Sequence, residues 1–365
     1  MGNSIQNSYG QSKIPTVLST LKKEDGTYTK HWKESLKYLI DKLLPNDTEE
    51  EEEEYHRTLR NYMESAYKTE AMAAPFTEEE VKEQIQSLKR NKSPGTDQIK
   101  SEVLQHLQQK LITSLTYLYN ECLAQRKFPR SWKESNLITI NTGEDKDVTS
   151  TKSYRPICLI NALGKLFEKL LIKRLTVHRM TQGQFENQYG FRKGRSTEDA
   201  MNHLYQLINT GNEKYKICIF IDISGAFDNL WYPALFNNLR NIKCPENLYY
   251  LLADYCRSRT VRYTCPGENI IKETTKGCPQ GSICGPTFWD LAVEPCLYMI
   301  NTLQETDGVI AYADDIAIVI SGDSRTEIEN KAKVMLDKLL TWCNENKLQL
   351  SKEKTVYMLL KGKLQ

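Results

Sequence analysis

The 365-residue sequence lacks several patterns that define common protein classes. Its ten cysteines include no Cys-x-x-Cys pair, and no histidine lies at zinc-finger spacing, which indicates reduced intracellular thiols rather than a metal or disulfide framework. No apolar run approaches the roughly 18 residues of a membrane span. No charged-then-apolar leader opens the chain. We therefore expect an intracellular protein of the nucleus or cytoplasm that does not bind membranes.

The sequence also lacks a strong overall charge, since its formal net charge is only +2. The charge is nevertheless uneven. Residues 81–200 carry 21 Lys and Arg against 12 Asp and Glu, whereas residues 1–80 carry 10 against 16 and residues 201–365 carry 18 against 19. The basic middle segment fits a surface that binds a polyanion, and a solvated, salt-bridged surface is the alternative on charge alone.

Residues 1–75 are predicted to form a peripheral N-terminal extension. The first 20 residues are polar and unpatterned, and residues 49–54 are six consecutive glutamates. Such a run is typical of solvated helix or disorder rather than of a site. The remainder, in a chain that is 39% hydrophobic, has the composition of an ordinary globular protein.

Helical patterns begin at Phe76 and Thr77, where Thr77 and Glu80 form a capping box and Phe76 pairs with Val81 as a hydrophobic staple. Apolar residues at helical spacing predict further helices over residues 101–125, 161–180, 229–241, 246–257, 283–303 and 324–346. Short apolar and β-branched runs predict strands at 136–140, 153–160, 214–223, 260–265, 269–275 and 355–360. Their interleaving without a strict repeat favours an α+β fold with helices packed on an antiparallel sheet.

The stretch GVIAYADDIAIVI, residues 308–320, places two carboxylates between two strand-like runs, which predicts a hairpin turning at Asp314 and Asp315. Asp222 ends another apolar strand, ICIFIDI. If the strands are neighbours, three carboxylates converge, and their repulsion requires a cation. Mg²⁺ suits such ligands, and two ions can hold the attacking and leaving oxygens of a phosphoryl transfer. A plain exposed turn is the alternative for an isolated Asp-Asp pair.

Two further stretches fit phosphate chemistry. The Gly/Pro-rich loop KGCPQGSICGP, residues 276–286, precedes a helix and could let backbone approach a nucleotide, although a structural loop is at least as good an interpretation. Arg155 in SYRPICLI is a fork donor suited to a phosphate. Neither feature is specific alone.

Taken in order, these stretches resemble the reverse transcriptases of non-LTR (LINE-type) retrotransposons, from about Lys92 to Lys361. The blocks that carry the resemblance are KSPGTDQI, SYRPICLINALGKLFEKLLIKRL, NQYGFRKGRSTEDAM, FIDISGAFDNL, GCPQGSICGPTFW, YADDIAIV and LQLSKEKTVYMLL. Seven blocks in one order make the match specific. The resemblance implies a right-hand polymerase fold and an RNA-directed DNA polymerase.

The resemblance also implies roles for individual residues. Asp222, Asp314 and Asp315 match the catalytic aspartates that hold two Mg²⁺ ions, with Mn²⁺ as a substitute, and the backbone carbonyl of Ile223 matches a further metal ligand. Phe227 matches the bulky residue beside the 2′ position of the incoming sugar, which implies deoxynucleotide preference. A ring there would exclude a hydroxyl by overlap, and a core aromatic at a helix start is a compatible interpretation.

Other matches concern the substrates, which would be an RNA template, a DNA or RNA primer and deoxynucleoside triphosphates. Gln280 and Gly281 match the block beside the nascent base pair, and Arg155 matches a triphosphate-binding arginine. Lys354 matches a lysine that could protonate pyrophosphate, with an exposed strand lysine as the alternative. Basic residues of GFRKGRST are expected to contact template or primer phosphates; these are Arg192, Lys193 and Arg195.

The resemblance divides the chain into an extension (1–75), fingers (76–212) and palm (213–365), without the thumb or endonuclease of the family. One departure is Asn141, which falls where the family often has a lysine; Lys146 or Lys152 could replace it. These departures leave open a weakly active or inactive domesticated fragment that binds nucleic acid or assembles with partners. An RNA-dependent RNA polymerase on the same palm is a second alternative.

Overall fold

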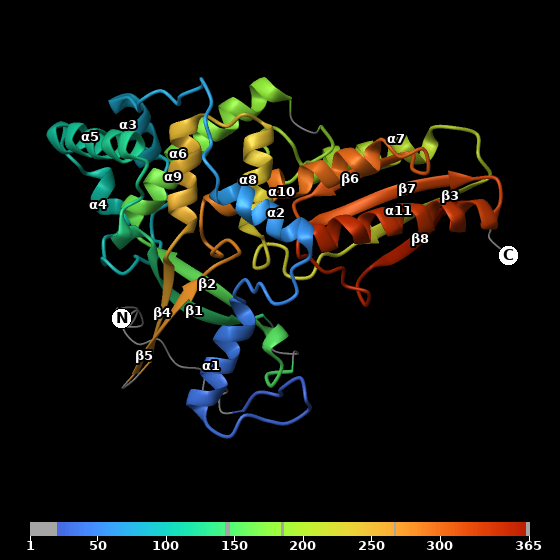
Figure 1. The fold of residues 1–365 in the computed structure, drawn as a ribbon, viewed down its shortest axis with the longest axis horizontal. Coiled ribbons are helices and arrows are strands. Elements are labelled where there is room, and N and C mark those ends of the chain that lie inside the picture. The colour runs from blue at the N-terminus through green and yellow to red at the C-terminus, as the bar shows by residue number, and fades with distance from the viewer. Residues whose placement is uncertain (1–19, 143–146, 184–185, 266–267, 363–365) are drawn as a thin grey trace, which may run out of the picture.

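The computed structural model describes residues 20–142, 147–183, 186–265 and 268–362, and the side chains of Cys265 and Glu268 are outside this description. Figure 1 shows one sheet at the right flanked by long helices, a group of helices at the left, and a second sheet with α1 below them. The helices are α1 Trp32–Leu43, α2 Glu54–Glu64, α3 Glu78–Gln86, α4 Ser101–Gln105, α5 Gln109–Gln125, α6 Ala162–Gln182, α7 Thr197–Asn209, α8 Tyr232–Asn241, α9 Glu246–Cys256, α10 Cys284–Asn301 and α11 Arg325–Glu345, with short 3₁₀ turns η1 Arg130–Trp132 and η2 Thr151–Ser153.

Within the described ranges, eight strands form two four-stranded sheets. The strands are β1 Glu134–Asn141, β2 Tyr154–Ile160, β3 Tyr215–Ile221, β4 Arg259–Cys265, β5 Glu268–Thr274, β6 Gly308–Tyr312, β7 Asp315–Gly322 and β8 Val356–Lys361. The first sheet has the order β2-β1-β4-β5, and only its β1–β4 pairing is parallel. The second has the order β6-β7-β3-β8 and is antiparallel throughout. The predicted mixture of helices and antiparallel sheet is therefore confirmed.

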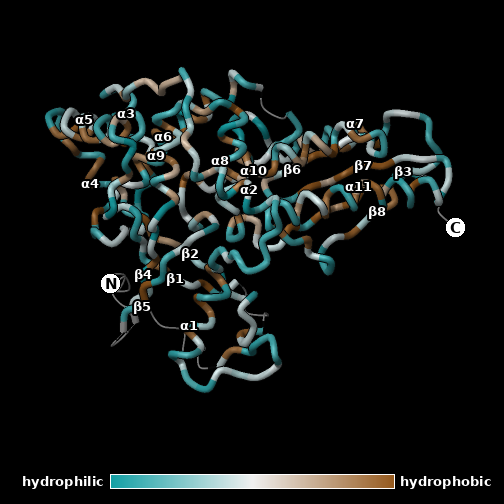
Figure 2. The backbone as a smooth tube through the Cα atoms, in the orientation of Figure 1, coloured by the Kyte–Doolittle hydropathy of each residue, from teal (hydrophilic) through white to brown (hydrophobic). Residues whose placement is uncertain are grey.

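The second sheet buries one face against the main core. Side chains that alternate along β3 and β7 join this core, among them Ile219, Ile221, Ile316 and Ile318, because successive strand residues point to opposite faces. Figure 2 shows the hydrophobic residues concentrated along β7 and in the helices beside it. Ile310 instead belongs to a small cluster with Ala200 and Leu204 of α7, so α7 covers part of the other face.

The helices predicted from apolar spacing are present as α3, α6 and α8 to α11, but α1, α2 and α7 were not predicted and one predicted helix is divided. Thr77 caps α3 and forms the predicted capping box with Glu80. The single helix predicted over residues 101–125 is wrong, because α4 ends at Gln105 and α5 starts at Gln109. No proline or glycine interrupts this stretch, so its apolar spacing gave no signal for the break.

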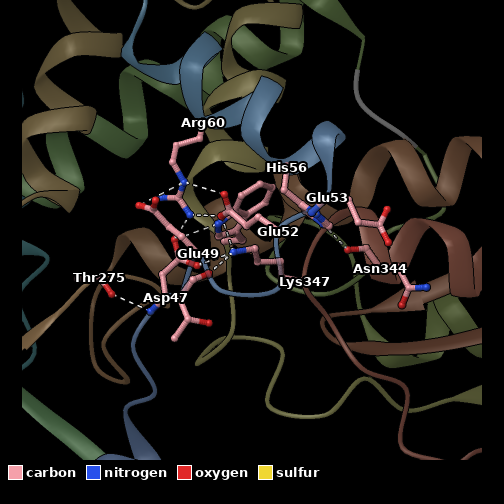
Figure 3. A network of polar contacts seen from close by, with 11 residues as sticks. Asp47, Glu49, Glu52, Glu53, His56, Arg60, Thr275, Asn344 and Lys347 are labelled. Carbon is pink, nitrogen blue, oxygen red and sulfur yellow. Dashed lines mark hydrogen bonds and ion pairs between the residues drawn. The ribbon is translucent and has the colours of Figure 1, made fainter.

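Residues 20–75 pack on the body of the protein. Leu36 and Ile40 of α1 share a core with Leu137 of β1 and Cys158 of β2. The acidic run, predicted to be solvated, contains a buried member, since the side chain of Glu52 is only 2% exposed. Figure 3 shows it between Arg60 and Lys347, where both cations contact it.

Nine cysteines are free and buried among the described residues, as predicted for reduced thiols. Burial raises the pKa of several of them, for example that of Cys158 to about 11. In the described part of the chain, no helix is long and apolar enough to cross a membrane.

Candidate active site

The second sheet brings Asp222 and Asp315 together. β3 and β7 are antiparallel, and the last pair of their register is Ile221 with Ile316. One step further along the same register, Asp222 comes opposite Asp315, and directly opposed residues share one face of a sheet. Because Ile221 and Ile316 face the main core, the two carboxylates lie on the other face.

Asp314 lies in the turn between β6 and β7. The turn predicted at Asp314 and Asp315 is shifted by one residue, since Tyr312 pairs with Asp315 and the two turn residues are Ala313 and Asp314. Ala313 has φ +59°, in the left-handed region that non-glycine residues seldom adopt. Asp315 is thus the first residue of β7 rather than part of the turn.

A groove of about 360 Å³ runs along this face of the sheet. Its lining includes Asp222, Asp315 and Lys354, with apolar residues of α7 on the opposite side such as Met201 and Leu204. Burial, followed by the charges of Asp314 and Asp222, raises the pKa of the Asp315 carboxyl, whereas Lys354 lowers it. The charges of Asp222 and Asp314 thus act on the Asp315 carboxyl, as expected for carboxylates at one end of the sheet.

Lys354 is the cation nearest to Asp222. Its Nζ lies 3.4 Å from Oδ1 of Asp222, and its side chain is 71% exposed. The residue lies in a turn before β8 rather than in a strand. An exposed ion pair of this length neutralises the carboxylate only weakly.

The carboxylates fit a divalent cation by one direct observation. Oδ2 of Asp222 is buried, and no group in the described part of the chain forms a hydrogen bond with it. An ionised oxygen in that position is costly unless a cation or donor reaches it. Across the described ranges, no three Asp, Glu, His or Cys side chains form a cluster that could hold a metal ion in the arrangement seen. Asp222 and Asp315 thus share one face of the sheet and Asp314 lies in the adjoining turn, but their side chains do not form a closed metal-binding cluster as they stand.

The backbone around Asp222 is fixed by the segment before β8. Ser351 N donates to the carbonyl of Asp222 at 2.8 Å, and Ser224 N donates to the carbonyl of Gln349, also at 2.8 Å. Between these bonds, Ile223 pairs with Leu350 and is 4% exposed. Residues far apart in the chain thereby hold the strand end that carries the first aspartate.

Phe227 lies five residues after Asp222, between two other aromatic rings. Its ring centroid is 5.9 Å from that of Phe191 and 5.9 Å from that of Trp289. Trp289 is fully buried, whereas Phe191 is 56% exposed. Phe227 is therefore a partly buried ring at the border between core and surface.

The Gly/Pro-rich loop is shaped by contacts within the protein. Gly281 has φ +114°, and a Cβ there would lie 2.7 Å from the carbonyl oxygen of Cys158. At the start of α10, Glu168 accepts from Ile283 N at 2.7 Å and Ser282 Oγ accepts from Cys284 N at 3.0 Å. The glycine and these helix amides are thus explained structurally, without a nucleotide.

Gln280 has a partner that the sequence did not indicate. Its Nε2 donates to both carboxylate oxygens of Asp228, at 3.2 and 3.1 Å. Burial raises the pKa of Asp228 to about 6, and the hydrogen bond from Gln280 opposes the rise. Asp228 follows Phe227 directly, so one short segment links the aromatic cluster to the glycine-rich loop.

The predicted phosphate ligands differ in their surroundings. Arg155 is exposed on β2 opposite Ile140, and no side chain within the described ranges pairs with its guanidinium. Asn141 ends β1 opposite Tyr154. Lys152 lies in η2 and is exposed, whereas Lys146 falls outside the described residues.

The basic residues of GFRKGRST do not form one uniform surface. Lys193 is exposed, and Arg195 pairs with Glu186 at 2.6 Å while its guanidinium lies 5.2 Å from the Tyr189 ring centroid. Arg192 is partly buried, and this burial lowers its pKa. To bind a phosphate, Arg195 would have to break its ion pair with Glu186.

Reasoning from sequence missed three residues that contact a predicted site residue or the Asp314 turn: Asp228, Gln188 and Trp289. Gln188 and Trp289 both contact the carbonyl of Ala313 in the turn. Gln188 belongs to the quoted block NQYGFRKGRSTEDAM, in which only the basic residues drew attention. A buried amide in a polar stretch carries no periodic signal, so the block itself was the only available indication.

Comparison with known proteins identifies related sequences. Residues 143–364 match the family model described as reverse transcriptase (RNA-dependent DNA polymerase). A 115 kDa protein of the retrotransposable element R1DM of Drosophila melanogaster is 32% identical over 77% of this chain and 27% of its own length. The Pol polyprotein of element R1 from Bradysia coprophila is 30% identical over 97% of this chain and 34% of its own length.

A third relative is the RNA-directed DNA polymerase from mobile element jockey of Drosophila melanogaster. It is 30% identical over 82% of this chain and 33% of its own length. The chain thus spans about a third or less of the curated relatives that it matches. The family model covers more than half of the chain and includes all three aspartates. The predicted resemblance is therefore confirmed, and the chain belongs to the reverse transcriptase family, with relatives among non-LTR retrotransposons.

Proposed function

We propose that this protein is an RNA-directed DNA polymerase that extends a primer 3′-hydroxyl with deoxynucleotides. The observation that carries the proposal is the placement of Asp222 opposite Asp315, with Asp314 in the adjoining turn and with Oδ2 of Asp222 buried and unpartnered. Carboxylates arranged in this way on a rigid sheet are suited to divalent cations, which the family generally uses.

Asp222, Asp314, Asp315 and the carbonyl of Ile223 would hold two Mg²⁺ ions, with Mn²⁺ as a substitute. Bound there, the ions would supply a lowered pKa for the primer hydroxyl and stabilise charge on the transferred phosphoryl group. The chain itself fixes the carboxylates on two paired strands. Lys354, whose Nζ is 3.4 Å from Asp222, would donate a proton to departing pyrophosphate.

The remaining residues would bind the substrates. Phe227, partly buried between Phe191 and Trp289, would exclude a 2′-hydroxyl from the incoming sugar. Gln280 and Gly281 would lie against the nascent base pair, and the unpaired guanidinium of Arg155 would bind the triphosphate. Template or primer phosphates would contact the basic loop that contains Arg192, Lys193 and Arg195.

In a right-hand description, residues 76–212 would form the fingers and residues 213–365 the palm, with residues 1–75 as an extension. The two sheets do not follow this linear boundary. β4 and β5 lie in the proposed palm segment but complete the sheet of β1 and β2. A boundary drawn in space would therefore assign residues 259–274 with the first sheet.

Primer extension on an RNA template with Mg²⁺ tests the proposal. Asp314→Asn changes a proposed ligand with little change in shape, and we expect extension to fall at least about 1,000-fold, equivalent to about 4 kcal/mol of transition-state stabilisation. Asp337→Asn, on the exposed side of α11, is the matched control and should extend primers like the parent. Parent-like extension by Asp314→Asn would refute the assignment of this carboxylate.

The primer-extension assay also distinguishes two alternative functions, a nucleic-acid-binding or assembly role and an RNA-dependent RNA polymerase. A parent chain that binds primer-template but makes no product would favour a nucleic-acid-binding or assembly role, which the exchange of a family lysine for Asn141 motivates. An RNA-dependent RNA polymerase would incorporate ribonucleotides. Replacement of Phe227 by Ala should admit ribonucleotides if the ring excludes the 2′-hydroxyl, and an unchanged preference for deoxynucleotides would remove that role.

A further inference from the structure

The turn that carries Asp314 has a conformation that its own sequence does not favour. Two-residue hairpin turns with a positive φ normally use Gly, Asn or Asp at the first position, because those residues tolerate it. Here the first turn residue is Ala313 at φ +59°. A single non-glycine residue in this region costs of order 1–3 kcal/mol and persists only where its surroundings impose it.

Gln188 supplies most of that constraint. Its Oε1 accepts from Ala313 N at 3.1 Å and its Nε2 donates to Ala313 O at 3.1 Å, so one side chain binds both polar groups of the strained residue. The same Oε1 accepts from Gly190 N at 2.9 Å. Gln188 is 1% exposed, so water cannot replace these bonds.

A second side chain reinforces the contact. Trp289 Nε1, from α10, also donates to Ala313 O, at 3.0 Å. Ala313 therefore interacts with two separate segments, neither of which belongs to its own hairpin. A rigid contact from outside is what a strained residue requires.

The segment that carries Gln188 is itself fixed to the hairpin. Tyr189 N donates to Ala311 O, and Ala311 N donates to Asn187 O, both at 2.8 Å. A Cβ on Gly190 would lie 2.1 Å from Ala313 N, so only glycine allows this close approach. Residues 187–190 thus pair in parallel beside β6, and Gly190 lies against the turn.

From these contacts we propose that Gln188 is a positioning residue, which sets the Ala313–Asp314 turn and thereby the direction of the Asp314 and Asp315 carboxylates. The inference rests on the proposed function, because it assigns those carboxylates to a divalent cation. Loss of a partner that orients metal ligands typically lowers metal affinity 10- to 100-fold. In this proposal Gln188 acts through Ala313 and is not itself a metal ligand.

Mn²⁺ binding to the protein without nucleic acid, followed by electron paramagnetic resonance, tests the inference without turnover. Gln188→Met keeps a similar volume and removes all three hydrogen bonds, and we expect Mn²⁺ affinity to fall about 10- to 100-fold. Amide hydrogen exchange of a peptide covering residues 308–320 should become faster in the same variant. Trp289→Phe removes one donor and should change both measurements in the same direction by less.

Tyr189→Phe is the matched control, since it alters the neighbouring buried residue and removes only the bond from Tyr189 Oη to His203. It should leave Mn²⁺ affinity unchanged. A folded Gln188→Met variant that binds Mn²⁺ within about twofold of the parent would overturn the inference. If Gln188→Met does not fold, Trp289→Phe is used in its place. Parent-like Mn²⁺ affinity in that variant would also overturn the inference.

The parent and Asp314→Asn separate this inference from the proposed function. If Asp314→Asn binds Mn²⁺ as tightly as the parent, the metal assignment itself fails and the positioning role fails with it. If Asp314→Asn loses Mn²⁺ while Gln188→Met does not, the proposed function survives and only the role of Gln188 is rejected.

Discussion

Two acidic clusters in this protein differ in what neutralises them. Asp47 and Glu52 lie between two cations: Arg60 Nη2 is 2.8 Å from Asp47, and Lys347 Nζ is 2.6 Å from Glu52 and 3.0 Å from Asp47 (Figure 3). The indole of Trp231 donates to Asp47 as well, at 3.2 Å. This cluster contains its own countercharge.

The aspartates of the candidate active site have no comparable neutralisation. Among the residues that the structure describes, the ion pair from the exposed Lys354 reaches only Asp222, and the Oδ2 atom of Asp222 has no hydrogen-bond partner. The charges of Asp314 and Asp222 raise the pKa of Asp315 in addition to burial. The comparison teaches that the first cluster stabilises the folded chain, whereas the second opposes folding unless a cation is added.

The largest expected effect comes from breaking the neutralised cluster. Lys347→Met should lower the free energy of unfolding by about 3 kcal/mol, the lower part of the range for a broken buried pair, because Arg60 still contacts both carboxylates. Urea unfolding measures the change. Lys338→Met, on the exposed surface of α11, is the control. Equal losses in the two variants would show that Lys347 contributes nothing beyond an ordinary surface lysine.

A smaller effect of opposite sign is expected at the active site. Asp315→Asn removes a repelled carboxylate and should raise the free energy of unfolding by about 0.5–1 kcal/mol in EDTA, as substitutions that relieve a functional site commonly do. Asp337→Asn should have no such effect. Thermal unfolding with and without Mg²⁺ measures it, and a variant less stable than the parent in EDTA would contradict the idea of an unneutralised cluster.

The third expected effect is a difference in pH dependence, which is seen only in acid. Arg60 above all, and also Lys347, lower the pKa of Glu52 from 4.5 to about 2. A lowered carboxyl pKa gives stability that is complete above pH 4.5 and is lost as the pH falls toward 2. The parent should therefore lose stability more steeply than Glu52→Gln across this window, by at most about 1.4 kcal/mol per pH unit.

Denaturation at several pH values, with Glu50→Gln as the control, measures this difference. Glu50 belongs to the same acidic run but is exposed. The raised pKa of Asp315 has the opposite sign, because it costs stability as the pH rises above the ordinary value of 3.8. Parallel curves for the parent and Glu52→Gln would mean that the ion pairs of Glu52 do not persist in solution.

Much of the fold and the central part of the site could be predicted from sequence because they depend on local or periodic signals. The strand before Asp222 and the helix start at Thr77 are examples, since alternation and capping chemistry act within a few residues. The ordered motif blocks located Asp222, Asp314 and Asp315 in a way that spacing alone could not. The assignment of individual ligands stays a prediction.

What could not be predicted depends on contacts between distant segments. The residues next to Glu52 in sequence do not distinguish it from the exposed glutamates of the same run. Its side chain is buried against Lys347, which lies 295 positions later in the chain. The shift of the turn to Ala313 follows from Gln188 and Trp289, which impose a conformation that alanine does not prefer. The burial of Glu52 and the conformation of Ala313 are both set by residues distant in sequence, so local sequence patterns do not predict them.

The contact between Asp47 and Lys347 joins residues 300 positions apart. During synthesis from the N-terminus, the acidic run leaves the ribosome long before Lys347 is made. Of the two cations that contact Glu52 in the folded chain, Arg60 alone is then available. Docking of the first helices is therefore expected to be a late event, completed when most of the chain has emerged. Nascent chains interrupted before Lys347 would leave this early segment accessible to proteases and chaperones.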